Sequence, residues 1–184
     1  RTLQRKSVYL PLAARDVQDF VEFARGTQLT GASVTVPFKE DVVGRCSKLD
    51  EITENIGAAN TLITLGSGGY RGRNTDVPGF IGDLKIRYNQ PLFGRRALVL
   101  GAGGAARAVV YGLRKEGAGV KVWARNPDQA KALCDDLGGS PVSEPEGMFD
   151  LLVNATPCGM QGEHAGEIAL PWRKLEPLLA HDAL

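Results

Sequence analysis

The sequence predicts an α/β fold, in which a doubly wound parallel sheet is joined to a smaller α/β unit. The second half of the chain alternates strand-like apolar runs with longer amphipathic runs, in the order strand, helix, strand, helix, strand. The first half alternates as well, with shorter segments, and the two halves meet at the polar stretch "NQPLFG". We therefore expect a smaller domain over residues 1–76, a connecting helix and linker over 77–90, and a doubly wound domain over 91–184.

The first half is expected to form a small sheet with helices on its faces. "VYLPL", residues 8–12, has the pattern of a short buried strand. Residues 14–26 have helical apolar spacing, and residues 31–43 are a strand broken by Pro37, which begins the next helix. The further elements expected are a helix over 49–57 and strands over 58–65 and 70–76, separated by the turn "GSGGY".

The second half follows the order of a parallel sheet with right-handed crossovers. A helix over 77–88 leads into it. Strands are expected over 95–101, 120–125 and 150–156, and helices over 104–117 and 126–139. Asn126 and Pro127 are typical of the cap and first position of the second of these helices.

Composition limits the classes of partner. The chain has 184 residues, a formal charge of +1 and 23% charged residues, with no basic block, so nucleic acid is not an expected partner. No apolar run approaches the roughly 20 residues that span a membrane. Its three cysteines fit neither a disulfide framework nor a zinc site and favour a reducing compartment. With only His164 and His181 present, acid–base chemistry is expected from lysine and carboxylates.

The stretch "VLGAGGAARAVV" indicates a dinucleotide site. Gly101, Gly103 and Ala106 match the G-x-G-x-x-G/A fingerprint directly after a strand and at the start of a helix, as in a Rossmann domain. Gly101 permits the tight turn, Gly103 lets a pyrophosphate approach the backbone, and Ala106 allows close packing of helix on strand. Gly104 and Ala105 belong to the same cofactor-binding turn. The alternative is a glycine-rich turn with no ligand.

Arg125 predicts which dinucleotide binds. An acidic residue about 20 positions after the glycines usually binds the ribose 2′-hydroxyl, but here the second strand ends in Arg125, followed by Asn126. A guanidinium attracts a 2′-phosphate through charge-assisted hydrogen bonds, so NADP is expected over NAD. The alternative is a solvated arginine at a strand end.

Three polar residues in the first half lie where structure alone does not favour them. Lys39 falls in the first turn of an expected helix, where a cation meets the helix dipole unfavourably. Asp76 closes a strand at the junction of the two units, and Asn60 lies within a strand. From the residues alone these form a polar cluster of unknown purpose.

Five motifs, in this order, resemble the shikimate dehydrogenase family: "VTVPFKE", "GAANTL", "GRNTDVPG", "GAGGAARA" and "VNATPCGM". The resemblance covers about Val8 to Met160. It implies an NADP-dependent oxidoreductase that interconverts 3-dehydroshikimate and shikimate in aromatic amino-acid biosynthesis, with a small molecule as its partner. The first domain would bind the substrate and the second would bind NADP.

The resemblance also implies the role of each site residue. Lys39 would be the acid–base lysine and Asp76 its partner, with Asn60 and Thr35 binding the substrate hydroxyls. Arg125 matches the phosphate clamp of the family, whose usual Asn-Arg-Thr is Ala-Arg-Asn here. Thr156 and Met160 would border the nicotinamide, and the alternative for Met160 is a place in the core.

Two departures from the family pattern suggest an internal fragment. The paired serines that precede the first strand of the family, and its C-terminal tyrosine and glutamine, have no counterpart in this sequence. We expect a parent chain that is longer, or fused to a further domain, and a cytoplasmic location, or a plastid if the source is a plant. Two alternatives stay open: a quinate dehydrogenase of the same superfamily, and a nucleotide-binding regulatory module without catalysis.

Overall fold

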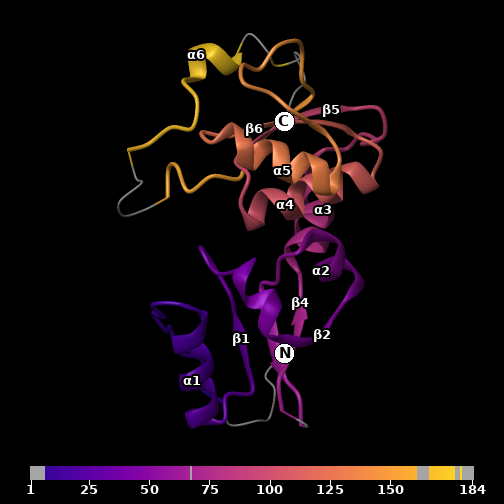
Figure 1. The fold of residues 1–184 in the computed structure, drawn as a ribbon. Helices are drawn as coiled ribbons and strands as arrows, with labels where there is room; N and C mark the ends of the chain where they lie inside the picture. The colour runs from indigo at the N-terminus through magenta and orange to yellow at the C-terminus, as the bar shows by residue number, and fades with distance from the viewer. Residues whose placement is uncertain (1–6, 67, 161–165, 177–178, 180–184) are drawn as a thin grey trace.

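The computed structural model describes residues 7–66, 68–160, 166–176 and 179, and arranges them as two lobes (Figure 1). The N-terminal lobe, residues up to 75, contains the sheet β1-β3-β4-β2, and the C-terminal lobe contains the sheet β7-β6-β5-β8. The first sheet is mixed and the second is wholly parallel. The predicted α/β class, with a parallel sheet and a smaller α/β unit, is confirmed.

The N-terminal lobe is built on the β3–β4 hairpin. Its elements are α1 (Val17–Thr27), β1 (Gly31–Ser33), the 3-10 helix η1 (Asp41–Arg45), β2 (Cys46–Leu49), α2 (Glu51–Ile56), β3 (Thr61–Thr64) and β4 (Tyr70–Arg73). Strand β1 pairs antiparallel with β3, whereas β2 pairs parallel with β4 at the other edge. Helix α1 covers the sheet with Val17, Val21 and Ala24, which are all buried. It continues one residue past Gly26, because Gln28 adopts the left-handed conformation that ends it.

Two predictions for the N-terminal lobe are wrong. Residues 8–12 form no strand, and Val8 and Tyr9 are 82% and 79% exposed, because no described strand pairs with them. The expected helix after Pro37 is instead a run of turns over residues 36–40, followed by η1. The carbonyl of Lys39 accepts a 2.7 Å hydrogen bond from Ala59 N, across the lobe, rather than from a residue one helical turn later.

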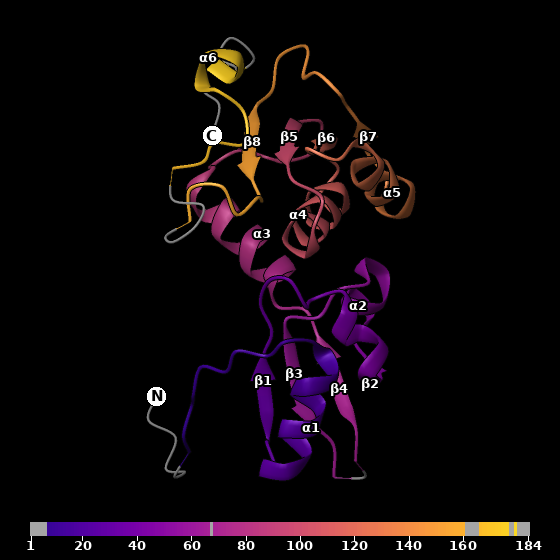
Figure 2. The same ribbon diagram turned by 60° about the vertical axis from the view of Figure 1, so that its left-hand side comes forward.

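The C-terminal lobe follows the predicted order of strands and helices. Its elements are α3 (Asp76–Arg87), β5 (Arg96–Leu100), α4 (Gly104–Lys115), β6 (Gly119–Trp123), α5 (Pro127–Leu137), β7 (Ser140–Pro141), β8 (Leu151–Asn154) and α6 (Trp172–Leu175). Figure 2 shows β8, β5, β6 and β7 across the lobe, with α3, α4 and α5 between this sheet and the N-terminal lobe. Because the strand order reverses at β5, the crevice between β5 and β8 is the topological switch point at which such sheets bind ligands. The two-residue strand β7 was not predicted, since it is too short to show a pattern.

Strand β5 is buried on both faces, which explains its continuous apolar sequence. Ala97 and Val99 pack with residues of α3, α4 and α5, whereas Leu98 and Leu100 pack on the opposite face with Phe149. None of these four β5 side chains is more than 3% exposed. This strand therefore gives the glycine-rich turn at its carboxyl end a rigid base.

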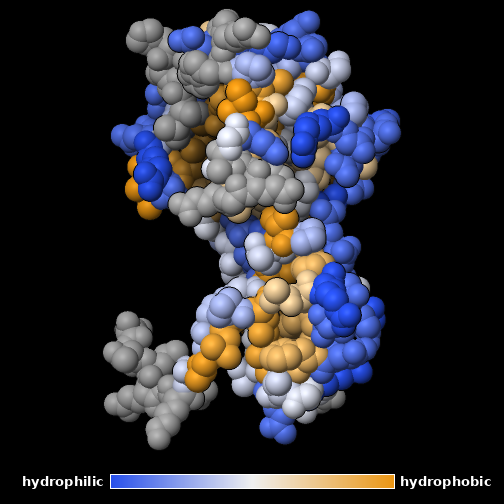
Figure 3. Space-filling model, turned by 90° about the vertical axis from the view of Figure 1, so that its left-hand side faces the viewer, coloured by the Kyte–Doolittle hydropathy of each residue, from blue (hydrophilic) through white to orange (hydrophobic). Residues whose placement is uncertain are grey.

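The two lobes meet where α2 approaches α4. Ile56 and Ala58 from the N-terminal lobe form one buried apolar cluster with Val77 of α3 and Ala108 of α4. Arg107 of α4 adds a polar contact, because its Nε donates a hydrogen bond to the carbonyl of Ile56. Figure 3 shows the junction as a waist between the lobes. Among the described residues, no helix combines the length and the hydrophobicity that crossing a membrane requires.

Candidate active site

Lys39 and Asp76 form an ion pair at the junction of the lobes. Lys39 Nζ lies 2.7 Å from Asp76 Oδ2, and the two side chains are 15% and 32% exposed. The prediction that Asp76 closes a strand is wrong: Asp76 is the first residue of α3. Its carboxylate therefore lies at the amino end of a helix, where an acidic side chain is favourably placed. The pair joins a turn of the N-terminal lobe to the helix that leads into the C-terminal lobe.

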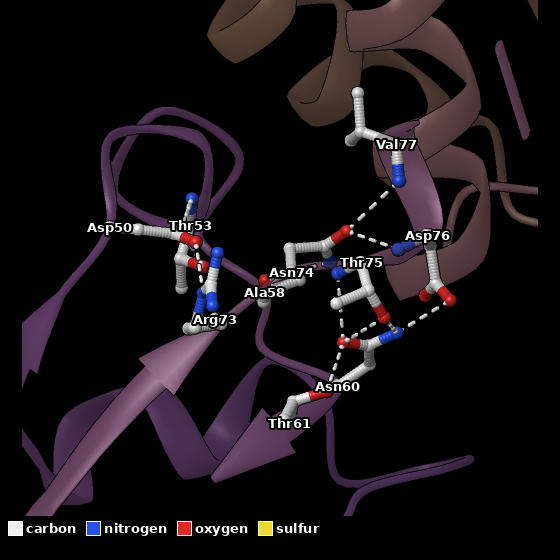
Figure 4. A network of polar contacts seen from close by, with 10 residues as sticks. All are labelled: Asp50, Thr53, Ala58, Asn60, Thr61, Arg73, Asn74, Thr75, Asp76 and Val77. Carbon is white, nitrogen blue, oxygen red and sulfur yellow. Dashed lines mark hydrogen bonds and ion pairs between the residues drawn. The ribbon is translucent and has the colours of Figure 1, made fainter. Parts of the chain in front are cut away.

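Asn60 holds the second oxygen of the Asp76 carboxylate. Its Nδ2 donates to Asp76 Oδ1 at 2.7 Å and to Thr75 Oγ1 at 2.9 Å, and its Oδ1 accepts from the backbone N–H of Thr75 at 3.0 Å (Figure 4). The prediction that Asn60 lies within a strand is wrong: Asn60 directly precedes β3. Because each carboxylate oxygen has its own partner, Asp76 is held in one orientation toward Lys39.

Asn74 supports this arrangement from beneath and was not identified from the sequence. It is only 2% exposed; its Nδ2 donates to Ala58 O at 3.0 Å, and its Oδ1 accepts from the backbone N–H groups of Asp76 and Val77 (Figure 4). Two of the free N–H groups at the start of α3 are thus satisfied by one side chain. An asparagine two residues before the start of a helix, with Thr75 between them, is the signal that could have indicated it.

A cavity of about 470 Å³ lies between the lobes. Its walls come from the turn after β5, the end of β6, the residues after β8 and the turn of the N-terminal lobe that carries Lys39. The predicted site residues among them are Lys39, Gly101, Gly103, Gly104, Ala105, Arg125, Asn126 and Thr156. Since β5, β6 and β8 all end at this edge of the sheet, the cavity occupies the switch-point crevice.

The small residues of the glycine-rich turn have different surroundings. Gly101 has a φ of +112°, and a Cβ there would lie 3.0 Å from Ala155 O, so the position is both conformationally and sterically closed to other residues. A Cβ on Gly103 would meet nothing within 4 Å. Ala106 is fully buried against the sheet. Gly103 is therefore the glycine that leaves open space at the amino end of α4.

Arg125 and Asn126 lie at the end of β6, and both line the cavity. No acidic side chain in the described part of the chain forms an ion pair with Arg125, so its guanidinium can bind an external anion. Asn126 caps α5, because its Oδ1 accepts a 3.0 Å hydrogen bond from Asp128 N. Asn126 is thus engaged in capping α5, whereas the guanidinium of Arg125 is available to bind a ligand.

Thr156 lines the cavity, whereas Thr35 and Met160 do not. Thr156 Oγ1 donates to Asn154 Oδ1 at 2.6 Å, which fixes the loop after β8. Met160 is 56% exposed. Thr35 is exposed and lines a separate, apolar cavity of about 390 Å³ within the N-terminal lobe. The structure therefore gathers Lys39, Asp76 and Asn60, whereas neither Thr35 nor Met160 lines the cavity that Lys39 lines.

The described residues bring no cluster of metal-binding side chains together, and their cysteines are free. They contain no group of three or more histidine, cysteine or acidic residues placed to hold a metal ion. All three cysteines are free, and burial raises the pKa of the Cys46 and Cys134 thiols, which disfavours the reactive thiolate. His164 and His181 lie outside the described residues.

The sequences of both lobes are similar to those of shikimate dehydrogenases. Residues 2–62 match the family model described as the shikimate dehydrogenase substrate binding domain. The shikimate dehydrogenase (NADP(+)) of Salinibacter ruber is 40% identical over 187 residues, which cover 90% of this chain and 62% of the relative.

Two solved structures share the arrangement of the lobes. The shikimate dehydrogenase of Aquifex aeolicus superposes with a TM-score of 0.80 at 31% identity, covering 94% of this chain and 63% of that one. The shikimate 5-dehydrogenase of Thermus thermophilus, solved in complex with NADP(H) and shikimate, gives 0.68 at 37% identity, covering 78% and 55%. The chain thus spans less than two thirds of the length of each of these relatives.

Proposed function

Because the chain belongs to the shikimate dehydrogenase family, we propose that it carries the reaction centre of an NADP-dependent oxidoreductase that interconverts 3-dehydroshikimate and shikimate. The observation that carries the proposal is the Lys39–Asp76 ion pair beside the cavity at the switch point. A protein that only binds a nucleotide has no need of an ammonium and a carboxylate held 2.7 Å apart there. The division into a substrate domain and an NADP domain is part of the same proposal.

The residues around the cavity fit NADP. The open space beside Gly103 and the free N–H groups at the start of α4 suit a pyrophosphate, which a helix N-terminus binds well. Arg125, with no ion pair among the described residues, suits a 2′-phosphate. When bound, the nicotinamide supplies the hydride for reduction of the ketone and accepts it in the reverse direction.

Lys39 supplies the proton that the reaction needs. During reduction its ammonium donates a proton to the oxygen of the substrate carbonyl, and in the reverse direction the amine accepts the proton of the hydroxyl. Asp76 positions Nζ through one carboxylate oxygen, and Asn60 fixes the carboxylate through the other. These contacts thus hold the ammonium of Lys39 in a defined orientation.

The free cysteines agree with a reducing compartment, and we propose the cytoplasm.

Oxidation of shikimate with NADP⁺, followed by the absorbance of NADPH, tests this function. We expect turnover with shikimate, weaker turnover with quinate, and a preference for NADP⁺ over NAD⁺. The assay is run on this chain and on the protein as its source encodes it, alongside titration of NADP⁺ by fluorescence. Binding of NADP⁺ without turnover in both forms would favour the regulatory module, and faster turnover with quinate would favour a quinate dehydrogenase.

A further inference from the structure

Gly104, the third glycine of the turn, lines the cavity, but a side chain on it would point at Lys39 of the N-terminal lobe. A Cβ built on Gly104 would lie 2.9 Å from Lys39 Cβ, 3.3 Å from Lys39 Cδ and 3.7 Å from Lys39 Cγ. The same construction on its neighbour Gly103 meets nothing within 4 Å. Of these two adjacent glycines, Gly104 therefore leaves room for the side chain of Lys39, whereas Gly103 leaves unoccupied space.

The contact of Gly104 is one that Lys39 cannot easily relieve. The nearest atom is Lys39 Cβ, which is attached to the backbone and is not the far end of a flexible chain. The backbone of Lys39 is itself held, because its carbonyl accepts a 2.7 Å hydrogen bond from Ala59 N. A methyl group on Gly104 would therefore push the turn that carries Lys39, or separate the two lobes.

Backbone conformation does not explain the glycine. Gly104 is the first residue of α4 and is not among the glycines with a positive φ. Alanine adopts helical backbone angles readily, and in a helix interior it is favoured over glycine by roughly 1 kcal/mol. The local preference is thus for a side chain, and what opposes it is the approach of Lys39 from the other lobe.

We propose that Gly104 is a positioning residue for Lys39, whereas Gly103 leaves space for the nucleotide. This inference rests on the proposed function. The stem of Lys39 lies against the start of α4, and its Nζ reaches Asp76 at the start of α3. The absence of a side chain at Gly104 thus sets how closely the proton donor approaches the cofactor-binding turn, and it links the two halves of the reaction centre.

Gly104→Ala and the matched control Gly103→Ala separate the two roles. At saturating NADP⁺, Gly104→Ala is expected to lose turnover by about 10²-fold, the cost of displacing a catalytic group by about 1 Å, with a smaller loss of NADP⁺ affinity than Gly103→Ala. Acetylation of Lys39, quantified by mass spectrometry, should become faster as Nζ leaves Asp76. Gly103→Ala should lose affinity for NADP⁺ and leave the acetylation rate of Lys39 unchanged.

A double-mutant cycle tests the same contact without any activity measurement. Lys39→Gly removes the atoms that the added methyl group would meet, so Gly104→Ala should lower the Tm of the unmodified chain but not that of Lys39→Gly. If the unmodified protein fails to oxidise shikimate, the proposed function falls, while the cycle and the acetylation rate still decide the inference. Equal effects of Gly104→Ala in both backgrounds would overturn it, as would a loss of NADP⁺ affinity matching that of Gly103→Ala.

Discussion

Replacing Asn74 by alanine removes three hydrogen bonds from one buried side chain beneath the Lys39–Asp76 ion pair. Its Oδ1 accepts from Asp76 N at 2.9 Å and from Val77 N at 3.1 Å, and its Nδ2 donates to Ala58 O at 3.0 Å. Alanine leaves the first two N–H groups without this acceptor and the carbonyl of Ala58 without this donor. Because the side chain is 2% exposed, water cannot readily replace it.

The expected loss of stability follows from these contacts. Loss of a helix cap costs about 0.5–2 kcal/mol, and a buried carbonyl left without its partner costs about 1–3 kcal/mol. Since the two terms share one side chain, we expect a combined loss of about 2–4 kcal/mol, which is a large fraction of the roughly 5–15 kcal/mol by which native proteins are stable. At about 2–4 °C per kcal/mol for a chain of this size, the Tm should fall by about 4–16 °C.

Thermal and urea unfolding of Asn74→Ala measures this loss. The matched control is Asn55→Ala, because Asn55 is exposed and donates its hydrogen bonds from the surface of α2. Surface substitutions of this kind usually change stability by less than about 0.5 kcal/mol. If Asn74→Ala is no less stable than Asn55→Ala, the argument that Asn74 anchors the start of α3 is refuted.

Three further substitutions test other parts of the structure. Arg125→Ala should weaken NADP⁺ binding by about 10–100-fold and leave NAD⁺ unchanged, since a hydrogen bond to a charged group contributes about 1.5–3 kcal/mol; equal losses in fluorescence titration would exclude a 2′-phosphate contact. Arg107→Met leaves the carbonyl of Ile56 without its donor. The free energy of unfolding, measured by urea titration, should fall by about 1–3 kcal/mol. An unchanged value would show that this contact between the lobes contributes nothing to stability. Burial acts to raise the pKa of Asp50, but its hydrogen bonds outweigh burial and hold the pKa below 3.8. The unmodified protein should therefore be more stable than Asp50→Asn by its full margin above about pH 4, and this margin should shrink as the pH falls through the lower folded pKa. A margin as large at about pH 3 as at about pH 7 would contradict this.

The elements of the C-terminal lobe could be predicted because local signals agree with one another. The apolar run of β5, the glycine-rich turn and the periodicity of α4 all indicate one strand–turn–helix unit. Asn126 and Pro127 mark the start of α5 in the same way, and the structure shows this cap. Where local preference and the final fold coincide, pattern alone is sufficient.

The N-terminal lobe was harder to predict because non-local contacts decide it. The apolar run over residues 8–12 has the pattern of a strand, but a strand needs a hydrogen-bonded neighbour, and no described strand pairs with it. Lys39 lies in a turn rather than a helix because its carbonyl bonds to Ala59, 20 residues along the chain. Neither the presence of a partner strand nor such a bond can be read from local sequence.

The same distinction applies to the site. Residue types and the resemblance to a family drew attention to Lys39, Asp76 and Asn60, and the structure brings these three side chains together across 37 and 16 residues of chain. Their distances, the support from Asn74 and the approach of Lys39 to Gly104 depend on how the two lobes pack. Periodicity and spacing do not encode that packing, so only the three-dimensional arrangement reveals it.

The role of Lys39 as the proton donor is tested most directly by the saturated turnover of Lys39→Met in shikimate oxidation, measured together with its affinity for NADP⁺. Methionine keeps an apolar stem of similar length and removes the ammonium that contacts Asp76. We predict that turnover falls by about 10²-fold or more, the range of general acid catalysis, while the Kd for NADP⁺ is unchanged. Turnover equal to that of the unmodified protein would contradict the account.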